Sequence, residues 1–283
     1  MKRLAPAAAS LLFAVALAGC DSPAGIPPTA PPTGTGSPSA PAGALLWSDE
    51  FDGAAGLSPD TTKWTYDVGT GWGNNQLEYD TARPANVSLD GQGHLAMTAR
   101  QESYLGQSYT SGRITTRGIF GQTKGRFEAR MQLPVGRGLW PAFWLLGADI
   151  SSVGWPACGE IDIMEYRGQE RATVHGSLHG PGYSGGSAIT QAFTLASGGF
   201  NDGFHVFAVD WDTGKISYEV DGVTYETITP ANLPTGTSWV FDHPFNIILD
   251  LAVGGNYVGS PDASTSFPQT LLVDYVRVYK VGS

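Results

Sequence analysis

Residues 159–166, GEIDIMEY, decide the fold of this chain. An apolar run of this kind predicts a β-strand, yet it carries three acids, and burying a carboxylate is costly unless it is paired or faces a cleft. Side chains alternate between the two faces of a strand, so Glu160 and Asp162 share one face. Ile161 and Ile163 then lie on the opposite face, against a core. The pattern predicts a strand that lines a polar cleft.

Glu165 has the wrong parity to share that face. A single β-bulge near Ile163-Met164 would add one residue to the count and return Glu165 to the side of the other two acids. Positions i and i+4 of a strand lie about 13 Å apart at Cα, and side chains that lean together close much of that gap. A carboxyl separation of about 5 Å is what a retaining glycosidase uses, with one acid as nucleophile and one as acid/base. The order of Glu160 and Glu165 in the sequence does not show which of them is the nucleophile and which is the acid/base.

The chain from residue 44 onward has mostly two-residue apolar periodicity. Residues 127–133 alternate between apolar and polar side chains, which is typical of a half-buried strand. Asp221-Gly222 divides residues 215–229 into a predicted hairpin whose turn needs positive φ. Other short runs predict strands at 94–100, 112–116, 173–178, 204–210, 245–251 and 271–281. No stretch of twelve residues has helical periodicity, so we expect an all-β domain of two packed antiparallel sheets, whose topology the pattern leaves open.

The amino-acid composition favours a turn-rich globular protein and disfavours a nucleic-acid-binding one. The chain has 38 Gly and 19 Pro in 283 residues, which favours a turn-rich fold, and 11% aromatic residues, which are enough to form a core. The net charge is −10. Such a surface repels phosphate backbones, so no nucleic-acid partner is expected.

The amino terminus has the features of an export signal. Lys2 and Arg3 precede an apolar run that is too short to span a bilayer, and the run ends in LAGC at residues 17–20. LAGC resembles the bacterial lipoprotein box, which implies cleavage before a lipid-modified Cys20; an ordinary signal peptide is the alternative. We therefore expect a leader at 1–19, a lipidated Cys20 with a Pro/Gly/Ser/Thr-rich linker at 20–43, and one domain at 44–283. The protein would be exported and would touch the membrane only through this anchor.

Residues 160–165 resemble the active-site strand of glycoside hydrolase family 16, in the variant with one extra residue that is typical of its laminarinase-like members. Further segments resemble the family in the same order: 71–79 (GWGNNQLEY), 109–113 (YTSGR), 125–130 (GRFEAR), 139–144 (LWPAFW), 175–180 (HGSLHG) and 273–279 (VDYVRVY). The resemblance covers essentially all of residues 44–283. It implies a β-jelly roll whose concave sheet forms a polysaccharide cleft.

The same resemblance implies roles for individual residues. Glu160 corresponds to the nucleophile, Glu165 to the acid/base and Asp162 to the residue that orients Glu160. The sugar-contacting positions of the laminarinase-like enzymes correspond to Trp140, Trp144 and Trp155, and we infer further polar substrate contacts from Asn74, Arg113 and His179.

A structural calcium ion is also implied by the resemblance. Its matching positions are Glu50 and Gly93, through backbone oxygens, and Asp274, through its side chain; oxygen ligands of this sort suit a hard cation. No cofactor is expected for catalysis, because His175 and His179 lack an acidic or sulfur partner at ligand spacing in the sequence.

The predicted function is retaining endo-hydrolysis of β-1,3-glucan by a monomer. The main alternative is β-1,3-1,4-glucanase activity, and extra Met164 together with Trp155-Pro156 favours the laminarinase-like side. Another family 16 hydrolase, such as an agarase or carrageenase, or a transglycosylase is less favoured. A glucan-binding lectin would use the same scaffold without need of the three acids.

Overall fold

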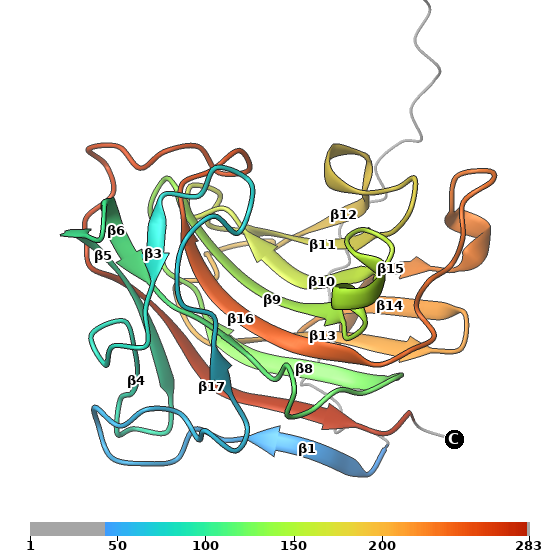
Figure 1. Cartoon of the computed structure of the whole chain (residues 1–283), viewed down its shortest axis with the longest axis horizontal. Helices are drawn as coiled ribbons and strands as arrows, with labels where there is room; N and C mark the ends of the chain where they lie inside the picture. The colour runs from blue at the N-terminus through green and yellow to red at the C-terminus, as the bar shows by residue number, and fades with distance from the viewer. Residues whose placement is uncertain (1–42, 282–283) are drawn as a thin grey trace, which may run out of the picture. The chain divides into compact units, whose positions relative to one another are not determined.

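A computed structural model describes residues 43–281 of the chain (Figure 1). The predicted leader, Cys20 and nearly all of the linker lie outside the described residues, so the predictions made for them stay predictions. Within residues 43–281, no helix combines the length and apolar character that a membrane crossing requires. The described helices are short: α1 (Ile150–Val153), η1 (Gly185–Ser187) and η2 (Pro230–Asn232).

The larger sheet has ten strands. Its main path runs in the order β15 (Val223–Ile228), β14 (Lys215–Val220), β13 (His205–Asp212), β8 (Gly125–Gln132), β17 (Gln269–Tyr279), β5 (Leu95–Tyr104), β6 (Gln107–Ser111) and β3 (Glu78–Asp80). β1 (Leu45–Asp49) also pairs with β17, and β4 (Val87–Leu89) pairs with β5. Only the β3–β6 pair is parallel.

The smaller sheet has seven strands and is entirely antiparallel. Its order is β12 (Ile189–Thr194), β11 (Thr173–His179), β10 (Glu160–Tyr166), β9 (Leu139–Gly147), β16 (Phe245–Val253), β7 (Arg113–Thr115) and β2 (Thr65–Tyr66). In Figure 1 this sheet forms a curved layer, with β9, β10 and β16 lying over β8 and β13. The predicted all-β jelly roll of two packed, mostly antiparallel sheets is confirmed.

The core lies between the two sheets, where the apolar faces of the alternating strands meet. Ile161 and Ile163 of β10 are buried there, as their parity predicts. Trp211 of β13 meets Phe245 of β16 edge to face, with ring centroids 5.2 Å apart, and so joins the two layers. Trp64 is also buried in this core, while Trp47 and Trp239 pack against the core and stay partly exposed.

The predicted hairpin is present as β14 and β15. Asp221 and Gly222 join the two strands with φ values of 50° and 79°. Both values lie in the left-handed region that a two-residue hairpin turn requires. The sequence signal for this turn is therefore confirmed at the backbone level.

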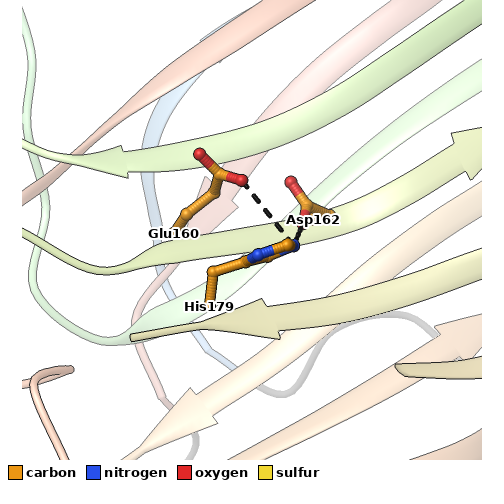
Figure 2. Close-up of side chains that lie close together, drawn as sticks. All are labelled: Glu160, Asp162 and His179. Carbon is orange, nitrogen blue, oxygen red and sulfur yellow. Dashed lines mark ion pairs between the residues drawn. The ribbon is translucent and has the colours of Figure 1, made fainter. Parts of the chain in front are cut away.

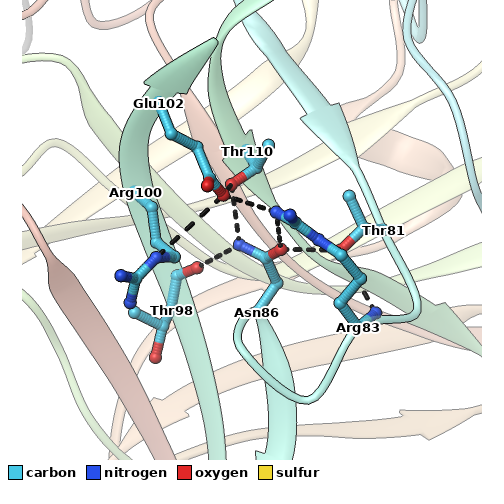
Figure 3. Close-up of polar contacts among 7 residues, drawn as sticks. All are labelled: Thr81, Arg83, Asn86, Thr98, Arg100, Glu102 and Thr110. Atoms are coloured by element: carbon cyan, nitrogen blue, oxygen red, sulfur yellow. Dashed lines mark hydrogen bonds and ion pairs between the residues drawn. The ribbon is translucent and has the colours of Figure 1, made fainter. Parts of the chain in front are cut away.

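A buried polar network fixes the strands beside the smaller sheet (Figure 3). Asn86 is fully buried; its Nδ2 donates to the Thr98 carbonyl at 2.9 Å and to Thr110 Oγ1 at 3.0 Å. Its Oδ1 accepts from Thr81 Oγ1 at 2.6 Å and from Arg83 Nη2 at 2.8 Å. Every polar atom of the amide is thus bonded. The network ties the loop after β3 to β5 and β6.

We expect Asn86→Ala to lower the stability of the fold. The change leaves several buried donors and acceptors without partners, which costs about 2–4 kcal/mol. For a domain of this size that corresponds to a fall in melting temperature of about 5–10 °C. Differential scanning calorimetry would measure it. Gln269→Ala, which removes a partly exposed amide bonded to the Ser266 carbonyl, is the control and should change little. Equal melting temperatures for the two variants would contradict this account of the network.

Candidate active site

The bulge in β10 brings the three acids to one face of the smaller sheet. Between Asp162 and Glu165, three steps along β10 match only two steps along each neighbouring strand, β9 and β11. The predicted bulge at Ile163-Met164 is therefore confirmed. Glu160, Asp162 and Glu165 consequently line the same cavity.

The strand register brings residues that are distant in the chain together on this face. One row across the sheet consists of Arg113 on β7, Asp250 on β16, Ala142 on β9, Glu165 on β10 and His175 on β11. The adjacent row contains Trp144, Asp162, Ser177 and Thr190, on β9 to β12. Side chains directly opposite each other in such rows lie about 4.5–5.5 Å apart at Cβ. The site is thus built from six strands.

Glu160 is held at the rim of the cavity by an indole. Trp155 donates from Nε1 to Oε2 of Glu160 at 3.1 Å. The Trp155 side chain is 48% exposed, so the ring also presents a large apolar surface to solvent. The same side chain can therefore position the carboxylate and offer a flat surface to a ligand.

Asp162 and His179 form a pair next to Glu160 (Figure 2). His179 Nε2 lies 2.9 Å from Asp162 Oδ2 and 3.7 Å from Glu160 Oε1. The backbone N–H of Gly185 donates to His179 Nδ1 at 3.1 Å, so in the neutral ring the proton is on Nε2, the nitrogen that lies near both acids. The imidazole is therefore a close polar neighbour of both carboxyl groups.

The expectation that His179 lacks an acidic partner is wrong. One ligand atom each from Glu160, Asp162 and His179 lies within 4.8 Å of the others, a grouping that could also hold a cation. The partners come from the neighbouring strand, where His179 is directly opposite Glu160. Spacing along the sequence does not reveal a pairing of this kind.

Glu165 has a hydrogen-bond donor for each carboxyl oxygen. Trp140 Nε1 donates to Oε1 at 3.1 Å, and Ser177 Oγ donates to Oε2 at 3.3 Å. The Trp140 ring is itself packed against Tyr257, with centroids 4.9 Å apart. The orientation of the carboxyl group is therefore fixed from two sides.

Burial makes these acids hold their protons more tightly. It raises the pKa of Glu160 to about 8 and the pKa of Glu165 to about 8, and the neighbouring Asp162 carboxyl adds to both shifts. The pKa of Asp162 lies well above its ordinary range because of burial and, secondarily, the Asp250 carboxylate. The site therefore retains a proton to donate near neutral pH. Because the pKa values of the two glutamates are raised to a similar level, they do not show which glutamate is the nucleophile and which is the acid/base.

The cavity over these acids has a volume of about 440 Å³. The predicted residues that line it are Asn74, Arg113, Trp140, Trp144 and Trp155, together with the three acids. His179 is not among the lining residues, and both of its ring nitrogens face groups of the protein. The contact of His179 with substrate therefore stays a prediction, whereas its contact with Asp162 is present in the structure.

The lining also contains residues that were not predicted from the sequence: Trp72 and Asp250, and with them Gly73, Gln76, Ala142, Leu146 and Ile150. The Arg113 guanidinium lies between two indoles, 4.9 Å from the Trp72 ring centroid and 4.8 Å from that of Trp144. Trp144 in turn donates from Nε1 to Asp250 Oδ1 at 2.7 Å. The sequence does contain a pattern that points to Asp250. It is a lone acid in an otherwise apolar predicted strand, and acids in an apolar strand are also what drew attention to residues 159–166. Trp72 lies in a Gly-rich loop whose geometry the sequence does not fix.

A second group of acids lies behind the wall of the cavity. Glu78 and Asp80 of β3 are 1% and 2% exposed. Glu78 Oε2 accepts from the Val253 backbone N–H at 2.8 Å. Burial raises the pKa of both residues, the charge of Asp250 raises both further, and the charge of Glu78 adds to the shift of Asp80. Only Arg113 opposes the shift of Asp80 as a nearby cation. The group is therefore most stable when it keeps protons.

The residues implied in calcium binding lie on the larger sheet, away from the cavity. Glu50 follows β1, and its carboxylate pairs with Arg277 at 2.7 Å. Asp274 of β17 forms an ion pair with Arg130 of β8. Gly93 lies between β4 and β5, and Asp52 Oδ1 is 4.0 Å from where a Cβ of residue 93 would be. Backbone oxygens of Glu50 and Gly93 are compatible with a cation, but the side chain of Asp274 already has a partner.

The sequence matches the profile described as Glycosyl hydrolases family 16 over residues 69–277. A "Beta-glucanase" of Rhodothermus marinus is 43% identical over 86% of this chain and 87% of its own length. The structure of an endo-β-1,3-glucanase from Pyrococcus furiosus has a TM-score of 0.79 at 46% identity, covering 83% of this chain and 94% of that one. A variant of SCLam, described as a non-specific endo-β-1,3(4)-glucanase with a glucan oligosaccharide at its active site, has a TM-score of 0.77 at 36% identity, covering 86% and 97%.

We expect Glu78→Gln to flatten the pH dependence of stability. Because the folded-state pKa of Glu78 is raised above its ordinary value of 4.5, its contribution to stability is complete below that value. The contribution is lost as pH rises through the folded-state pKa. The melting temperature of the wild type should therefore fall between about pH 5 and pH 8, and that of Glu78→Gln should fall less.

The control is Asp60→Asn. Hydrogen bonds from Thr62 lower the pKa of this exposed acid, so its contribution to stability is lost only as pH falls. This variant should keep the wild-type slope above pH 5. Parallel curves for Glu78→Gln and the wild type would contradict the prediction.

Proposed function

The chain belongs to glycosyl hydrolase family 16, and on that premise we propose that it cleaves β-1,3-glucan chains internally with retention of the β configuration. The observation that carries the proposal is the bulge in β10, which places Glu160 and Glu165 on one face of one cavity. The β-glucanase and endo-β-1,3-glucanase relatives support the choice of substrate.

In this proposal Glu165 acts first as an acid. It donates its proton to the glycosidic oxygen as that bond breaks, and Glu160 attacks the anomeric carbon to form a glycosyl ester. Glu165, now a carboxylate, accepts a proton from the water that cleaves the ester, and Glu160 is released. Asp162, which lies beside His179, orients Glu160 through its position between the two glutamates on β10.

The cavity walls suit a neutral polysaccharide. The indoles of Trp72, Trp140, Trp144 and Trp155 offer flat apolar surfaces for the C–H faces of pyranose rings. Arg113 is the lining cation, and it already pairs with Asp67 at 3.1 Å.

Mixed-linkage β-1,3-1,4-glucan is the second candidate substrate. It is supported by the description of SCLam as a non-specific endo-β-1,3(4)-glucanase. A binding protein without activity would not need three acids brought together by a bulge. A product profile on laminarin, lichenan and agarose separates these possibilities, since β-1,3-glucan should give the fastest cleavage and agarose none.

Export and anchoring through a lipid on Cys20 belong to the same proposal. They are supported by the LAGC sequence at residues 17–20 and the Pro-rich segment that follows. Such a segment extends at about 3.1 Å per residue and would hold the domain away from the membrane surface.

We expect Glu160→Ala to abolish hydrolysis of laminarin while largely preserving binding, because the lining indoles remain. Glu165→Ala should slow hydrolysis about 10²- to 10⁴-fold through loss of the acid. On an aryl β-laminaribioside with a good leaving group, azide should partly restore Glu165→Ala and give a β-glycosyl azide. Asp162→Ala should reduce the rate less than either glutamate change.

Proton NMR of the first products tests the stereochemistry. The β anomer should appear first in the wild type. Early α anomer would exclude the double displacement and the roles given to both glutamates. Circular dichroism of each variant, with laminarin binding, shows whether a loss of activity reflects the chemistry or the fold.

A structural calcium ion held by Glu50, Gly93 and Asp274 also remains a proposal. A bound ion stabilises the folded state by mass action, so calcium should raise the melting temperature and a chelator should lower it. Turnover at low temperature should change little, because the cavity lies on the other sheet. In Asp274→Asn, calcium should no longer raise the melting temperature. If the wild type melts at the same temperature with calcium and with a chelator, the proposed calcium site is wrong.

A further inference from the structure

Ser177 is a buried hydroxyl in the site that the steps above do not use. It is 2% exposed and lies opposite Asp162 in the β10–β11 register. Its Oγ donates to Glu165 Oε2 at 3.3 Å. Because Ser177 is nearly inaccessible, it acts on a bound chain through Glu165.

The direction of that hydrogen bond is determined by a second hydroxyl. Thr190 of β12 is directly opposite Ser177, and its Oγ1 donates to Ser177 Oγ at 3.0 Å. An oxygen that accepts from Thr190 keeps its own proton free for Glu165. Thr190 is exposed, so the relay Thr190–Ser177–Glu165 runs from the open face of β12 to the centre of the site.

The backbone of Ser177 is fixed from the larger sheet. Tyr218 of β14 donates from its hydroxyl to the Ser177 carbonyl at 2.8 Å. This approach requires glycine at position 176, because a Cβ there would lie 2.4 Å from the Tyr225 hydroxyl and 2.5 Å from the Tyr218 ring. The hydroxyl of Ser177 is therefore held by its strand, by Thr190 and by the layer beneath.

We propose that Ser177, oriented by Thr190, is a positioning residue that fixes the Glu165 carboxyl group and stabilises the charge that develops on it when its proton leaves. The inference rests on the proposed function, in which Glu165 is the acid/base. Ser177 forms no bond to the substrate. It acts on the carboxylate, to which a hydrogen bond is stronger than to the neutral acid.

Several charged or titratable groups face Glu165 and act on its proton at the same time. They are Glu160 and Asp162 on β10, His175 and His179 on β11, Tyr218 and Tyr225 on β14 and β15, and Tyr257 after β16. Asp162 opposes ionisation, whereas His179, Trp140 and Ser177 favour it. Removing the Ser177 hydroxyl should therefore raise the pKa of Glu165 without changing the other groups.

The experiment is a pH profile of kcat/KM on laminarin for five proteins: the wild type, Ser177→Ala, Ser177→Thr, Thr190→Val and Thr194→Val. Ser177→Ala should lower kcat about tenfold, leave KM nearly unchanged and move the basic limb to higher pH, since that limb reports the acid that must be protonated. Ser177→Thr keeps a hydroxyl and should restore most of the rate. Thr190→Val should show a smaller shift in the same direction.

Thr194→Val is the matched control. Thr194 lies on the same face of β12 and makes the equivalent bond to Thr173 Oγ1 at 3.0 Å, but it does not contact Glu165. It should behave as the wild type. An unshifted basic limb in Ser177→Ala, an equal shift in Thr194→Val, or a Ser177→Thr variant no better than Ser177→Ala would overturn the relay.

Carboxyl titration separates this proposal from the proposed function. A wild type without activity on any glucan would refute the function and leave the relay testable. In protein with ¹³C-labelled glutamate carboxyls, assigned with Glu165→Gln, the Glu165 signal should titrate at higher pH in Ser177→Ala than in the wild type. An unchanged titration would overturn the relay whatever the activity.

Discussion

Hydrogen bonds from indole N–H groups to buried carboxylates are the interaction on which this site depends. Trp155 and Trp140 bond Glu160 and Glu165, both at 3.1 Å, and Trp144 bonds Asp250 at 2.7 Å. An indole N–H donates without bringing a positive charge. It therefore satisfies a buried carboxyl oxygen and still lets burial keep the pKa high, whereas an arginine at the same place would lower it. The rings that line the cavity are thus also the groups that hold its acids.

The bulge in β10 and the register of the smaller sheet bring these hydrogen-bonded carboxyl groups together in one cavity. Without the extra residue, Glu165 would point into the core between the sheets, where Ile161 and Ile163 lie. With it, Glu165 falls in the row that contains Ala142 and Asp250, and the small side chain of Ala142 leaves the space above β9 open. The paired strands on both sides hold the bulge in place.

The buried acids of the cavity and those behind its wall lie close to one another and affect one another's pKa values. Glu160 and Asp162 lie beside His179, Glu165 lies between Trp140 and Ser177, and Asp250 leads to the protonated group at Glu78 and Asp80 behind the wall. The Asp250 charge raises the pKa of Asp162, and the Asp162 charge raises the pKa of Glu165. The Asp250 charge also raises the pKa of Glu78 and Asp80. Asp250 therefore acts on both groups of acids.

The sequence by itself determined the strand periodicity, the hairpin at Asp221-Gly222, the face shared by Glu160 and Asp162, and the need for a bulge before Glu165. These features are local, because side-chain alternation and turn chemistry depend on neighbours in the chain. Only the tertiary structure decided which strands adjoin β10. The pairing of His179 with Asp162, the contact of Ser177 with Glu165 and the packing of Arg113 between Trp72 and Trp144 all join different strands or loops. Such contacts follow from sheet register, which a single sequence without pairing information does not specify.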